Sequence, residues 1–492
     1  MALALSTFLL GLPQEAQADA SLKIRCALAR EAASRKDILT WGQMLMPQKF
    51  NLPFNEMHRH IIKTRHTPTC SLKAPRGHSK STISCSLLPL FQGLEEPNQP
   101  FSFYLNCQNT EEKALAINRS IKNEIEGNPA IRYLYGDVSG KRMTDAEFVL
   151  KSGVVFKAVG TGTSLRGVQY QNMRPDWVCL DDAYDESDIY SLETTRKKTS
   201  WILSTLYKAL ARGRPTRFTA QGTAINKGDI LNTMEKWANC SSRTFSAIIS
   251  KGGKDVPLWP ELYTMAQLLE ERERLGTAIF NREMCNIYTD DTESIVKSAW
   301  LNNWEYDPAI HWSQPVSDQK VIGAVLGCDP STGQNESGDP AGFAVVVITM
   351  GPGKRFDYWI EALHNQVMSW DGRLAQLERM YSYQNSKGTI YQIRRAYVEA
   401  VAGFIDFGNQ AKAKTGLPVE LVSYVKGKIP NLASKAGLFE FGKMHISNKI
   451  DKKDRDELES QLCQNSPEHD DLRDAVLLCL EESKSIPMAA WV

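Results

Sequence analysis

Apolar and polar positions in the first half of the chain follow two alternating patterns. Residues 102–109, SFYLNCQN, form a short apolar run, and the next segment, TEEKALAINRSIKNEIEG, repeats its apolar residues with helical spacing. The first pattern is typical of a buried strand and the second of a helix with one face against a core. Because strands and helices alternate in this way as far as residue 225, the pattern predicts an α/β domain with a parallel sheet and helices on both faces.

The same patterns predict further elements of this half. Residues 21–66 carry Ala, Arg, Glu and Leu in periodic runs and are predicted to be helical, whereas residues 147–160 alternate as a β-hairpin does. Residues 174–186, RPDWVCLDDAYDE, contain a continuous apolar run that is typical of a strand buried on both faces. Residues 250–315 include a charged helix and are predicted to be a connector.

The second half of the chain begins with a different pattern. Residues 320–350 hold two apolar runs around a turn of Gly, Ser and Asn, which predicts a hairpin, and the preceding segment HWSQPVSDQK has the composition of a linker. A second short strand is predicted to end at Glu399, and GLFEFGKMHI at 437–446 is predicted to be another hairpin. We therefore expect a domain boundary near residues 310–318.

Composition allows this organisation without adding to it. The chain has 492 residues, of which 42% are hydrophobic and 23% are charged, and this is enough for roughly two or three globular domains. The net charge of +1 means that any affinity for nucleic acid must come from local basic patches. The ten cysteines are scattered without metal-site spacing, which predicts reduced thiols.

The N-terminal residues resemble a signal peptide only in part. MALALSTFLLGLPQEAQADA has an apolar run followed by Ala-Gln-Ala, but it lacks the basic residues that open such peptides. We interpret residues 1–34 as a docking segment. No run reaches the roughly 18 apolar residues needed to span a bilayer, so no membrane partner is predicted.

A candidate phosphate loop lies at residues 72–84, LKAPRGHSKSTIS. It places Lys80 and Ser81 between a tight turn and a predicted helix, where backbone N–H groups and the helix dipole favour phosphate oxygens. Lys80 would contact the β- and γ-phosphates, and Ser81 would hold Mg²⁺. Ala74 and Ser79 stand where the regular motif has glycines, and the alternative interpretation is a surface turn that contains Lys-Ser-Thr by chance.

A pair of carboxylates follows the apolar run at 177–180. Asp181 and Asp182 end a predicted parallel strand, and residues at this end of such strands bind ligands in open α/β sheets. Asp181 is predicted to hold Mg²⁺ through water, and Asp182 to orient or deprotonate the attacking water. The alternative is an acidic loop after a core strand.

A second set of carboxylates comes from three segments of the second half. Cleavage of a phosphodiester by two divalent ions requires carboxylates from different segments to converge, and Mg²⁺ or Mn²⁺ prefers oxygen ligands. Asp329, Glu399 and Asp471 fit this need in the order strand, strand, helix. Asp474 shares a helical face with Asp471 and is the next candidate, and Asp339 is a weaker one. Helix capping is the alternative role for each.

Basic residues gather in two segments. Seven Lys and Arg residues lie in 196–217 without an acidic residue, and they form either a solvated helix face or a phosphate contact. Lysines also dominate 426–455, where the predicted hairpin would hold a DNA backbone beside the acidic residues without reading base sequence.

Several of these features together match a known family. Arg76 precedes Lys80 by four residues, and the segments VVFKAVGTGTSLRGVQYQNMRPDWVCLDD and QGTAINKGDIL follow in order. From about residue 40 to about residue 485 the chain resembles the large terminase subunit of tailed bacteriophages. The resemblance implies a P-loop NTPase domain of the ASCE type at 35–312, with a parallel sheet, followed by a ribonuclease-H-like α/β nuclease domain at 318–492.

The resemblance also implies roles for individual residues. Arg76 would stabilise charge on the γ-phosphate, and Gly222 with Thr223 would sense hydrolysis. The catalytic carboxylate is often Glu in related motors, so Glu186 is an alternative to Asp182. Arg166 and Gly167 would lie near the nucleotide or the DNA. Gln43 and His58 would be candidate contacts to the nucleotide base, although a lone histidine is more often a surface or core residue. The residues implied to bind nucleotide are Gly77, Ser79, Lys80, Ser81, Thr82, Asp181 and Thr223.

A terminase would use ATP with Mg²⁺ to drive double-stranded DNA into a procapsid, and a nuclease with Mg²⁺ or Mn²⁺, as a pair of ions, would cut the concatemeric genome. Its implied partners are a small terminase subunit, the portal protein and further copies of itself during packaging. It would act in the host cytoplasm, docked transiently on the procapsid, without becoming a stable part of the virion.

Three other interpretations stay open at this point. The chain could be a helicase-nuclease of recombination or repair, although no further helicase motif follows Thr223. The missing glycines of the phosphate loop would suit a nuclease with a vestigial nucleotide site. A non-enzymatic assembly protein is the third interpretation.

Overall fold

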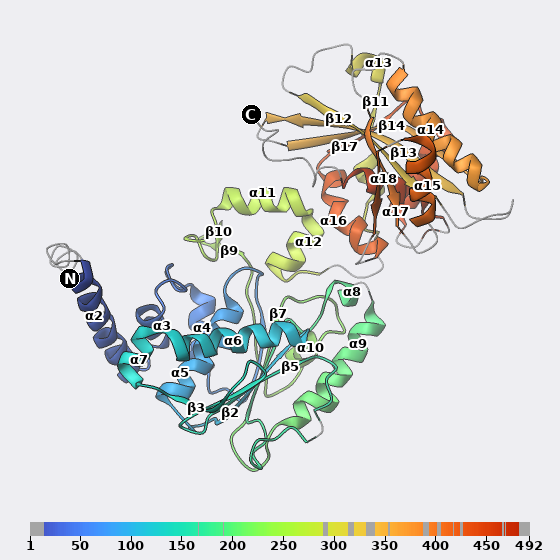
Figure 1. The fold of residues 1–492 in the computed structure, drawn as a ribbon. Helices are drawn as coiled ribbons and strands as arrows, with labels where there is room; N and C mark the ends of the chain where they lie inside the picture. Colours follow the sequence, from blue (N-terminus) through green and yellow to red (C-terminus); the bar gives the residue numbers. More distant parts are fainter. Residues whose placement is uncertain are drawn as a thin grey trace. The chain divides into compact units, whose positions relative to one another are not determined.

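The computed structural model describes residues 14–165, 167–189, 191–288, 294–312, 319–330, 340–352, 355–386, 393–400, 405–416, 418–423, 427–464, 467 and 469–481. The chain forms two compact units (Figure 1). The first comprises Met1–Leu269 and Phe280–Asp290, and the second comprises Glu270–Ile279 and Asp291–Val492.

The first unit is built on an eight-stranded sheet in the order β3-β4-β5-β2-β6-β7-β1-β8. Pairing is parallel from β5 through β8, whereas β3, β4 and β5 pair antiparallel. The predicted hairpin at 147–160 is therefore confirmed. The strands are β1 (Thr69–Lys73), β2 (Phe103–Gln108), β3 (Ser139–Met143), β4 (Glu147–Leu150), β5 (Val155–Gly160), β6 (Trp177–Asp181), β7 (Arg217–Gly222) and β8 (Ser241–Thr244), with β9 (Ile248–Lys251) and β10 (Lys254–Pro257) as a separate hairpin.

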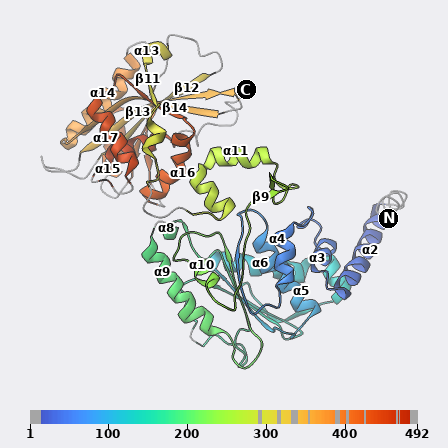
Figure 2. The same ribbon diagram turned by 180° about the vertical axis from the view of Figure 1, so that it is seen from behind.

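Helices cover both faces of this sheet because its strands are apolar on both sides. In β6, Trp177 and Cys179 belong to one core, and Val178 and Leu180 belong to the other. Figure 2 shows α5 and α9 on opposite sides of the strands. The helices are α2 (Gln14–Ser34), α3 (Ile38–Leu45), α4 (Glu56–Lys63), η1 (Thr82–Leu87), α5 (Leu88–Glu95), α6 (Glu111–Gly127), α7 (Pro129–Tyr135), α8 (Glu186–Ile189), α9 (Leu192–Trp201), η2 (Ile202–Leu206), η3 (Tyr207–Ala209) and α10 (Ile230–Glu235).

The helix predicted after residue 109 shows how local sequence sets its start. Thr110 is the N-cap of α6, and its hydroxyl accepts a hydrogen bond from the Lys113 N–H. Glu111 and Glu112 then place negative charge in the first turn, where the helix dipole favours it.

The second unit is built on a seven-stranded sheet in the order β11-β17-β14-β13-β12-β15-β16. The three central strands β12, β13 and β14 pair antiparallel in chain order. β15 pairs parallel with β12, and β16 pairs parallel with β15. This arrangement is ribonuclease-H-like, so the predicted fold class is confirmed. The strands are β11 (Glu305–Tyr306), β12 (Lys320–Asp329), β13 (Ala341–Gly351), β14 (Arg355–Gln366), β15 (Ile393–Glu399), β16 (Val419–Val422) and β17 (Met444–Ser447).

Alternation along β12 and β13 divides the second unit into two cores. Val325 and Val346 face the core that contains α16, α17 and α18, whereas Leu326 and Val345 face the core that contains α14 and α15. The helices are η5 (Ser298–Leu301), α13 (Pro308–His311), α14 (Trp370–Ser386), α15 (Ile405–Thr415), α16 (Lys428–Glu440), α17 (Lys452–Cys463) and α18 (Asp471–Cys479), and α11 (Met265–Leu275), α12 (Thr277–Phe280) and η4 (Asn281–Cys285) lie where the chain passes between the units.

One element of the second unit was predicted wrongly. The segment 437–446 is not a hairpin, because its first half completes α16 and only its second half forms a strand, β17. Leu432 and Phe439 are seven residues apart on α16 and both enter the core. The helical spacing of apolar residues across 432–439 therefore outweighs the strand-like pattern of the shorter segment.

The limits of the units also differ from the predicted domains. The second unit includes residues before 318, because Val296, Leu301 and Trp304 belong to its core. At the other end of the chain, α2 covers most of the predicted docking segment, and Cys26, Ala29 and Ala33 of this helix belong to the core of the first unit. Residues 1–13 lie outside the described residues.

Two glycines set how closely α18 approaches the second sheet. A Cβ added to Gly327 on β12 would lie 1.9 Å from the Ala475 carbonyl oxygen, and one added to Gly342 on β13 would lie 2.2 Å from the Asp471 carbonyl oxygen. Both obstacles are backbone atoms of α18, so no rotamer change removes them. The two glycines therefore place the first turn of α18 directly on the sheet. Within the described part of the chain, no helix has the length and apolar character needed to cross a membrane.

We predict that Gly327→Ala destabilises the second unit. The added methyl group can fit only if α18 moves away, and overpacking of this kind costs about 1–3 kcal/mol. Thermal unfolding followed by tryptophan fluorescence measures the change. Gly372→Ala is the matched control, because its Cβ would meet side-chain atoms and not backbone, the Ser369 hydroxyl at 3.1 Å and Met368 Cβ at 3.5 Å. Equal melting temperatures for the two variants would contradict the prediction.

Candidate nucleotide-binding and metal sites

The predicted phosphate loop and the predicted Mg²⁺ carboxylates meet at one edge of the first sheet. The loop follows β1, Asp181 ends β6, and β7 lies between these two strands. In the parallel register Lys73 is opposite Gly222 and Asp181 is opposite Gln221. The carboxyl ends of the three strands are therefore level, which brings residues about a hundred positions apart in sequence to one place.

The backbone of the loop explains why glycine is usual in this motif. Gly77 and Ser79 have φ angles of 74° and 60°, in the left-handed region that favours glycine. Ser79 adopts this conformation at a cost of about 1–2 kcal/mol. A helix begins at Lys80 and continues through η1 and α5, so the loop retains the geometry of a phosphate-binding turn although its sequence departs from the motif.

Lys80 places a buried positive charge at this edge. Its Nζ atom lies 3.0 Å from Oδ2 of Asp182, and only 6% of the residue is exposed. Burial alone would lower the pKa of Lys80, but the carboxylates of Asp182 and Asp181 outweigh that effect and raise the pKa. Lys80 is thus charged at neutral pH, as its predicted contact with phosphate oxygens requires.

The two adjacent carboxylates differ in their surroundings. Asp181 is buried, and its carboxylate accepts hydrogen bonds from the Gln221 amide at 2.8 Å and from the Ser81 hydroxyl. Burial, followed by repulsion from Asp182, raises the pKa of Asp181, and Lys80 opposes this. Asp182 has a φ of 43° and a side chain that is 44% exposed. Asp181 thus offers a buried carboxylate, whereas the side chain of Asp182 is accessible to water.

Ser81 and Asp181 fit the predicted Mg²⁺. A hydroxyl and a carboxylate within hydrogen-bonding reach, beside a lysine for phosphate, form the oxygen-rich set that Mg²⁺ takes together with nucleotide phosphates. Gly222 extends the site, because a Cβ there would lie 3.0 Å from Oδ1 of Asp182. Thr223 follows Gly222 directly. Movement of Thr223 at the end of β7 would therefore move Gly222 against the side chain of Asp182.

An aromatic cluster supports the phosphate loop from behind. His58 contacts the His78 carbonyl through Nε2 at 2.8 Å, and its ring packs on Trp259 at 4.8 Å between centroids. The His78 ring stacks on Tyr263 at 5.4 Å, and its Nδ1 contacts the Arg76 carbonyl at 2.9 Å. His58 is fully buried, so it holds the loop, and it has no exposed surface for the predicted contact with a base.

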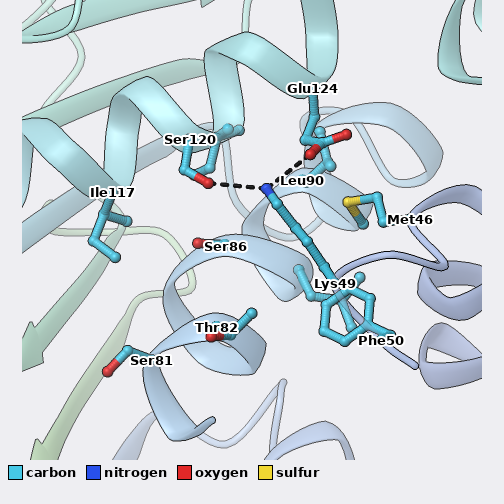
Figure 3. A pocket seen from close by; sticks show the side chains of 12 residues that line it. Met46, Lys49, Phe50, Ser81, Thr82, Ser86, Leu90, Ile117, Ser120 and Glu124 are labelled. Carbon is cyan, nitrogen blue, oxygen red and sulfur yellow. Dashed lines mark hydrogen bonds and ion pairs between the residues drawn. The ribbon is translucent and has the colours of Figure 1, made fainter. Parts of the chain in front are cut away.

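A cavity of about 320 Å³ borders the start of the phosphate-loop helix (Figure 3). Ser81 and Thr82 lie on one side of it, and Met46 and Phe50 provide apolar walls. Lys49 reaches across the cavity to Ser120 at 3.0 Å and Glu124 at 2.7 Å, as the figure shows. The cavity has room for a group with both apolar and hydrogen-bonding surfaces next to the phosphate loop. Gln43, the other predicted base contact, does not line it.

The other nucleotide-site predictions are placed as follows. Arg76 is exposed and its guanidinium lies 3.4 Å from Glu283, so a role at the γ-phosphate would require it to leave this partner. Gly167 has a φ of 76°. The side chain of Glu186, at the start of α8, and the whole of Arg166 lie outside the described residues.

The basic segment 196–217 serves several structural purposes. Arg217 is 2% exposed, stacks on Trp177 at 4.9 Å and donates a hydrogen bond to Thr219. Arg214 pairs with the buried Asp176. A phosphate contact by Arg217 is therefore excluded by burial, because the guanidinium is already enclosed at the base of the sheet.

The second site is a cluster of carboxylates in the second unit. Asp329, Glu399 and Asp474 offer oxygen atoms that all lie within 4.8 Å of one another, and each residue is buried. Asp329 ends β12, Glu399 ends β15, and Asp474 lies in the first turn of α18. β12 and β15 are parallel neighbours, so their ends meet, and the close approach of α18 adds the third ligand. The set fits a hard divalent cation.

Two cations compensate this cluster. The Nζ atom of Lys428 lies 2.5 Å from Asp474 and 3.6 Å from Asp329. Arg473 donates to Asp470 at 2.9 Å and contacts Asp474 at 3.4 Å. Burial raises the pKa of Asp474 to about 6, against the opposing effect of Lys428. Burial also raises the pKa of Glu399. These carboxylates thus favour binding of further positive charge or protons.

The preference for Asp471 over Asp474 as a candidate ligand was wrong. Asp471 was placed ahead of Asp474, but the group within ligand distance contains Asp474 and not Asp471. Asp471 is also buried at the start of α18, yet its carbonyl faces Gly342 of β13. Asp339, the weaker candidate, lies outside the described residues.

Lys428 and Gln221 are the site residues that sequence reasoning did not single out. Lys428 is among the lysines of 426–455, the segment that was expected to hold a DNA backbone, but it precedes the predicted hairpin at 437–446. The available signal was its position as the first residue of a helix, where a positive charge opposes the helix dipole. Gln221 had a signal in its place directly before Gly222 and Thr223.

No family model matches this chain, and no curated protein sequence does. Solved structures with a similar fold include the large terminase from a thermophilic bacteriophage, at 9% identity and a TM-score of 0.48 over 87% of this chain and 99% of that one. The ATPase domain of the Thermus phage P74-26 large terminase aligns at 11% identity and a TM-score of 0.33 over 51% of this chain and 97% of that one. The human cytomegalovirus terminase nuclease domain aligns at 14% identity and a TM-score of 0.28 over 39% and 94%.

We predict that Asp474→Asn weakens Mn²⁺ binding far more than Asp471→Asn does. Removing one anionic ligand from the cluster should raise the dissociation constant by about tenfold or more, whereas Asp471→Asn should change it by less than about twofold. Isothermal titration of the full chain with Mn²⁺, without nucleotide, measures both. A larger effect of Asp471→Asn would show that the cation uses a different set of ligands.

We predict that His58 makes the first unit less stable in acid. Burial lowers the pKa of His58 from 6.5 to about 4, so between these values the unfolded chain binds a proton that the folded chain does not. Stability is therefore full above pH 6.5 and falls as the pH drops towards 4, by about 3 kcal/mol in total.

Unfolding midpoints in urea between pH 7 and 4 test this expectation. His58→Gln keeps one hydrogen-bond donor and one acceptor but does not titrate, so its stability should fall less steeply with decreasing pH than that of the wild type. His78 remains in both proteins and serves as a constant background. Identical pH dependences would show that His58 is protonated without cost in the folded state.

Proposed function

We propose that this protein is a packaging ATPase and nuclease, a large terminase subunit that uses ATP hydrolysis to drive double-stranded DNA into a procapsid and cuts the concatemeric genome. The observation that carries the proposal is the presence of two separate sites in one chain. Lys80, Ser81 and Asp181 gather at the edge of one sheet, and Asp329, Glu399 and Asp474 gather at the edge of another. The known terminase motifs quoted above and the fold of each unit support the same assignment.

In the first site, the roles follow from charge and exposure. Lys80 is buried and charged, so it would bind the β- and γ-phosphates, and the helix that starts beside it would add backbone N–H groups. Ser81 and Asp181 would hold Mg²⁺, which supplies charge neutralisation on the phosphates. Asp182 is exposed and adjacent, so it would orient or deprotonate the attacking water, with Glu186 as the alternative. The nucleoside has room in the cavity beside Thr82.

Loading of the first site would change the partners of Lys80. Without nucleotide, Lys80 is paired with Asp182 at 3.0 Å. A bound γ-phosphate would take over Lys80 and leave Asp182 available to water. Gly222 touches Asp182 at the end of β7, so this exchange would be transmitted to Thr223. Arg76 would contribute to γ-phosphate stabilisation after leaving Glu283.

In the second site, Asp329, Glu399 and Asp474 would hold one or two Mg²⁺ or Mn²⁺ ions. Such ions activate water and stabilise the charge on the scissile phosphate in phosphodiester hydrolysis. The protein contributes a rigid position for each ligand, because two strands and the closely packed α18 place them independently. Neither site contains a base-reading element in the described residues, so sequence choice is assigned to a partner.

The proposed function brings partners and a location with it. A small terminase subunit would select the DNA, the portal protein would hold the motor on the procapsid, and several copies of this chain would act together. This work would take place in the host cytoplasm, with transient docking on the procapsid and no stable place in the virion.

Separation of the two activities tests the proposal. Lys80→Ala should reduce DNA-stimulated ATP hydrolysis by about a hundredfold or more while plasmid cleavage persists, because only phosphate binding is lost. Asp329→Asn should do the reverse. The assays use the full chain with Mg²⁺ or Mn²⁺, and with DNA and partner subunits supplied.

Other outcomes decide between the remaining interpretations. A wild-type chain that cleaves DNA but never hydrolyses ATP would be a nuclease with a vestigial nucleotide site. ATP-dependent strand separation of a forked duplex would indicate a helicase-nuclease. If all variants support packaging as well as the wild type does, the chain acts as a non-enzymatic assembly protein.

A further inference from the structure

Lys428 occupies the mouth of the carboxylate cluster. Its Nζ atom lies 2.5 Å from Asp474 Oδ2, 3.1 Å from Asp470 Oδ1 and 3.6 Å from Asp329 Oδ2. It therefore contacts two of the three residues whose oxygens could hold a divalent cation. A single ammonium group sits where the carboxylates converge.

The position of Lys428 in its helix is unfavourable by itself. Lys428 is the first residue of α16, and a positive charge there opposes the helix dipole. The preceding Gly427 has a φ of 88° and provides no side-chain cap. Local preference would place a small polar or acidic residue at this start. The ion pairs of Lys428 with the carboxylates therefore favour a lysine at this position, whereas the start of the helix does not.

The second cation of the cluster, Arg473, is held differently. It is 2% exposed, and it also donates to the carbonyl groups of Gln461 and Gln464, both at 3.4 Å. These contacts with the end of α17 fix its guanidinium in place. The side chain of Lys428 is 36% exposed, and it reaches the cluster as a flexible chain from the surface. Arg473 is thus held by backbone carbonyl groups as well as by carboxylates, whereas the ion pairs of Lys428 are with carboxylates.

A divalent cation and the Lys428 ammonium cannot share this place. Both would draw on the carboxylates of Asp329 and Asp474, and their charges would repel at such short range. Binding of a metal ion therefore requires Lys428 to leave. A flexible lysine that leaves an anionic cluster next to a bound metal needs a new anionic partner, and the substrate class of the proposed nuclease supplies one in its phosphodiester backbone.

We propose that Lys428 is a positioning residue that exchanges partners: it occupies the carboxylate cluster when metal and DNA are absent, and it moves onto a DNA phosphate when a divalent cation takes the cluster. This inference rests on the proposed nuclease function. The exchange lowers metal affinity in the absence of DNA. It also links metal binding to DNA binding, because the metal ion displaces Lys428 from the cluster and a DNA phosphate accepts the displaced Lys428.

Metal binding without DNA tests the first half of the exchange. Mn²⁺ is titrated into the full chain, without nucleotide, and binding is measured by calorimetry for the wild type and Lys428→Met. Removal of the competing ammonium should tighten Mn²⁺ binding by about tenfold, a coupling of ordinary size between two ligands of one site. Lys428→Arg keeps the charge and should stay close to the wild type.

Lys443→Met is the matched control for charge and exposure. Lys443 lies in the same unit, is 32% exposed on its side chain and pairs with Asp357 at 3.5 Å, away from the three cluster carboxylates. It should leave Mn²⁺ affinity unchanged. Thermal midpoints of all variants confirm that the second unit is folded. Equal Mn²⁺ affinity in Lys428→Met and wild type would overturn the proposal.

DNA binding tests the second half. With Ca²⁺ in place of Mn²⁺, the affinity for a short duplex is measured at several salt concentrations. Lys428→Met should bind DNA several-fold more weakly, and the slope of log K against log salt should fall by about one. Tighter metal binding together with unchanged DNA affinity would overturn the transfer of Lys428 to phosphate.

Failure of the nuclease proposal itself gives a different result. If Asp329→Asn leaves Mn²⁺ binding unchanged, the cluster is not the metal site and the proposed function fails. If Asp329→Asn abolishes Mn²⁺ binding while Lys428→Met has no effect on it, the metal site stands and only the exchange of Lys428 fails.

Discussion

The pairing of buried carboxylates with nearby positive charge is the interaction on which both sites depend. Asp181 in the first unit and Asp474 in the second are almost fully enclosed, and an enclosed carboxylate is costly unless positive charge or hydrogen bonds reach it. Lys80 lies 3.0 Å from Asp182, the neighbour of Asp181, and Lys428 lies 2.5 Å from Asp474, which Arg473 also contacts at 3.4 Å. Each site is therefore poised to exchange its lysine contact for a ligand that brings charge of its own.

Sheet geometry makes this compensation possible. Asp181 in the first unit and Asp329 and Glu399 in the second stand at the carboxyl ends of strands that have a parallel neighbour, where the ladder ends and side chains reach the edge. In the first unit β7 lies between the phosphate-loop strand and β6, and the level ends of these strands bring Lys80 and Asp181 to one edge. The second unit instead brings α18 onto the sheet, where Gly327 and Gly342 allow backbone contact.

Patterns of local origin were predicted well. The strand before Asp181, the hairpin at 147–160, the helix capped by Thr110 and the strand ending at Glu399 follow from runs and spacings of neighbouring residues. The segment 437–446 was predicted wrongly because its ten residues carry both periods, and the core contacts of Leu432 and Phe439 decide for the helix. Neighbouring residues did not determine the roles of His58 and Arg217 either, because the burial of their side chains depends on elements elsewhere in the chain.

The sequence by itself determined the residue types at the sites, the strands and helices that carry most of them, and the α/β class of each half, because these depend on neighbours in the chain. Only the tertiary structure decided that Asp474 and not Asp471 joins Asp329 and Glu399, and that Lys428 sits among them. The reason is that the register of α18 on the sheet is set by its close backbone contact with Gly327 and Gly342. That register depends on backbone atoms about 130 to 150 positions away along the chain, whose distance no local pattern encodes.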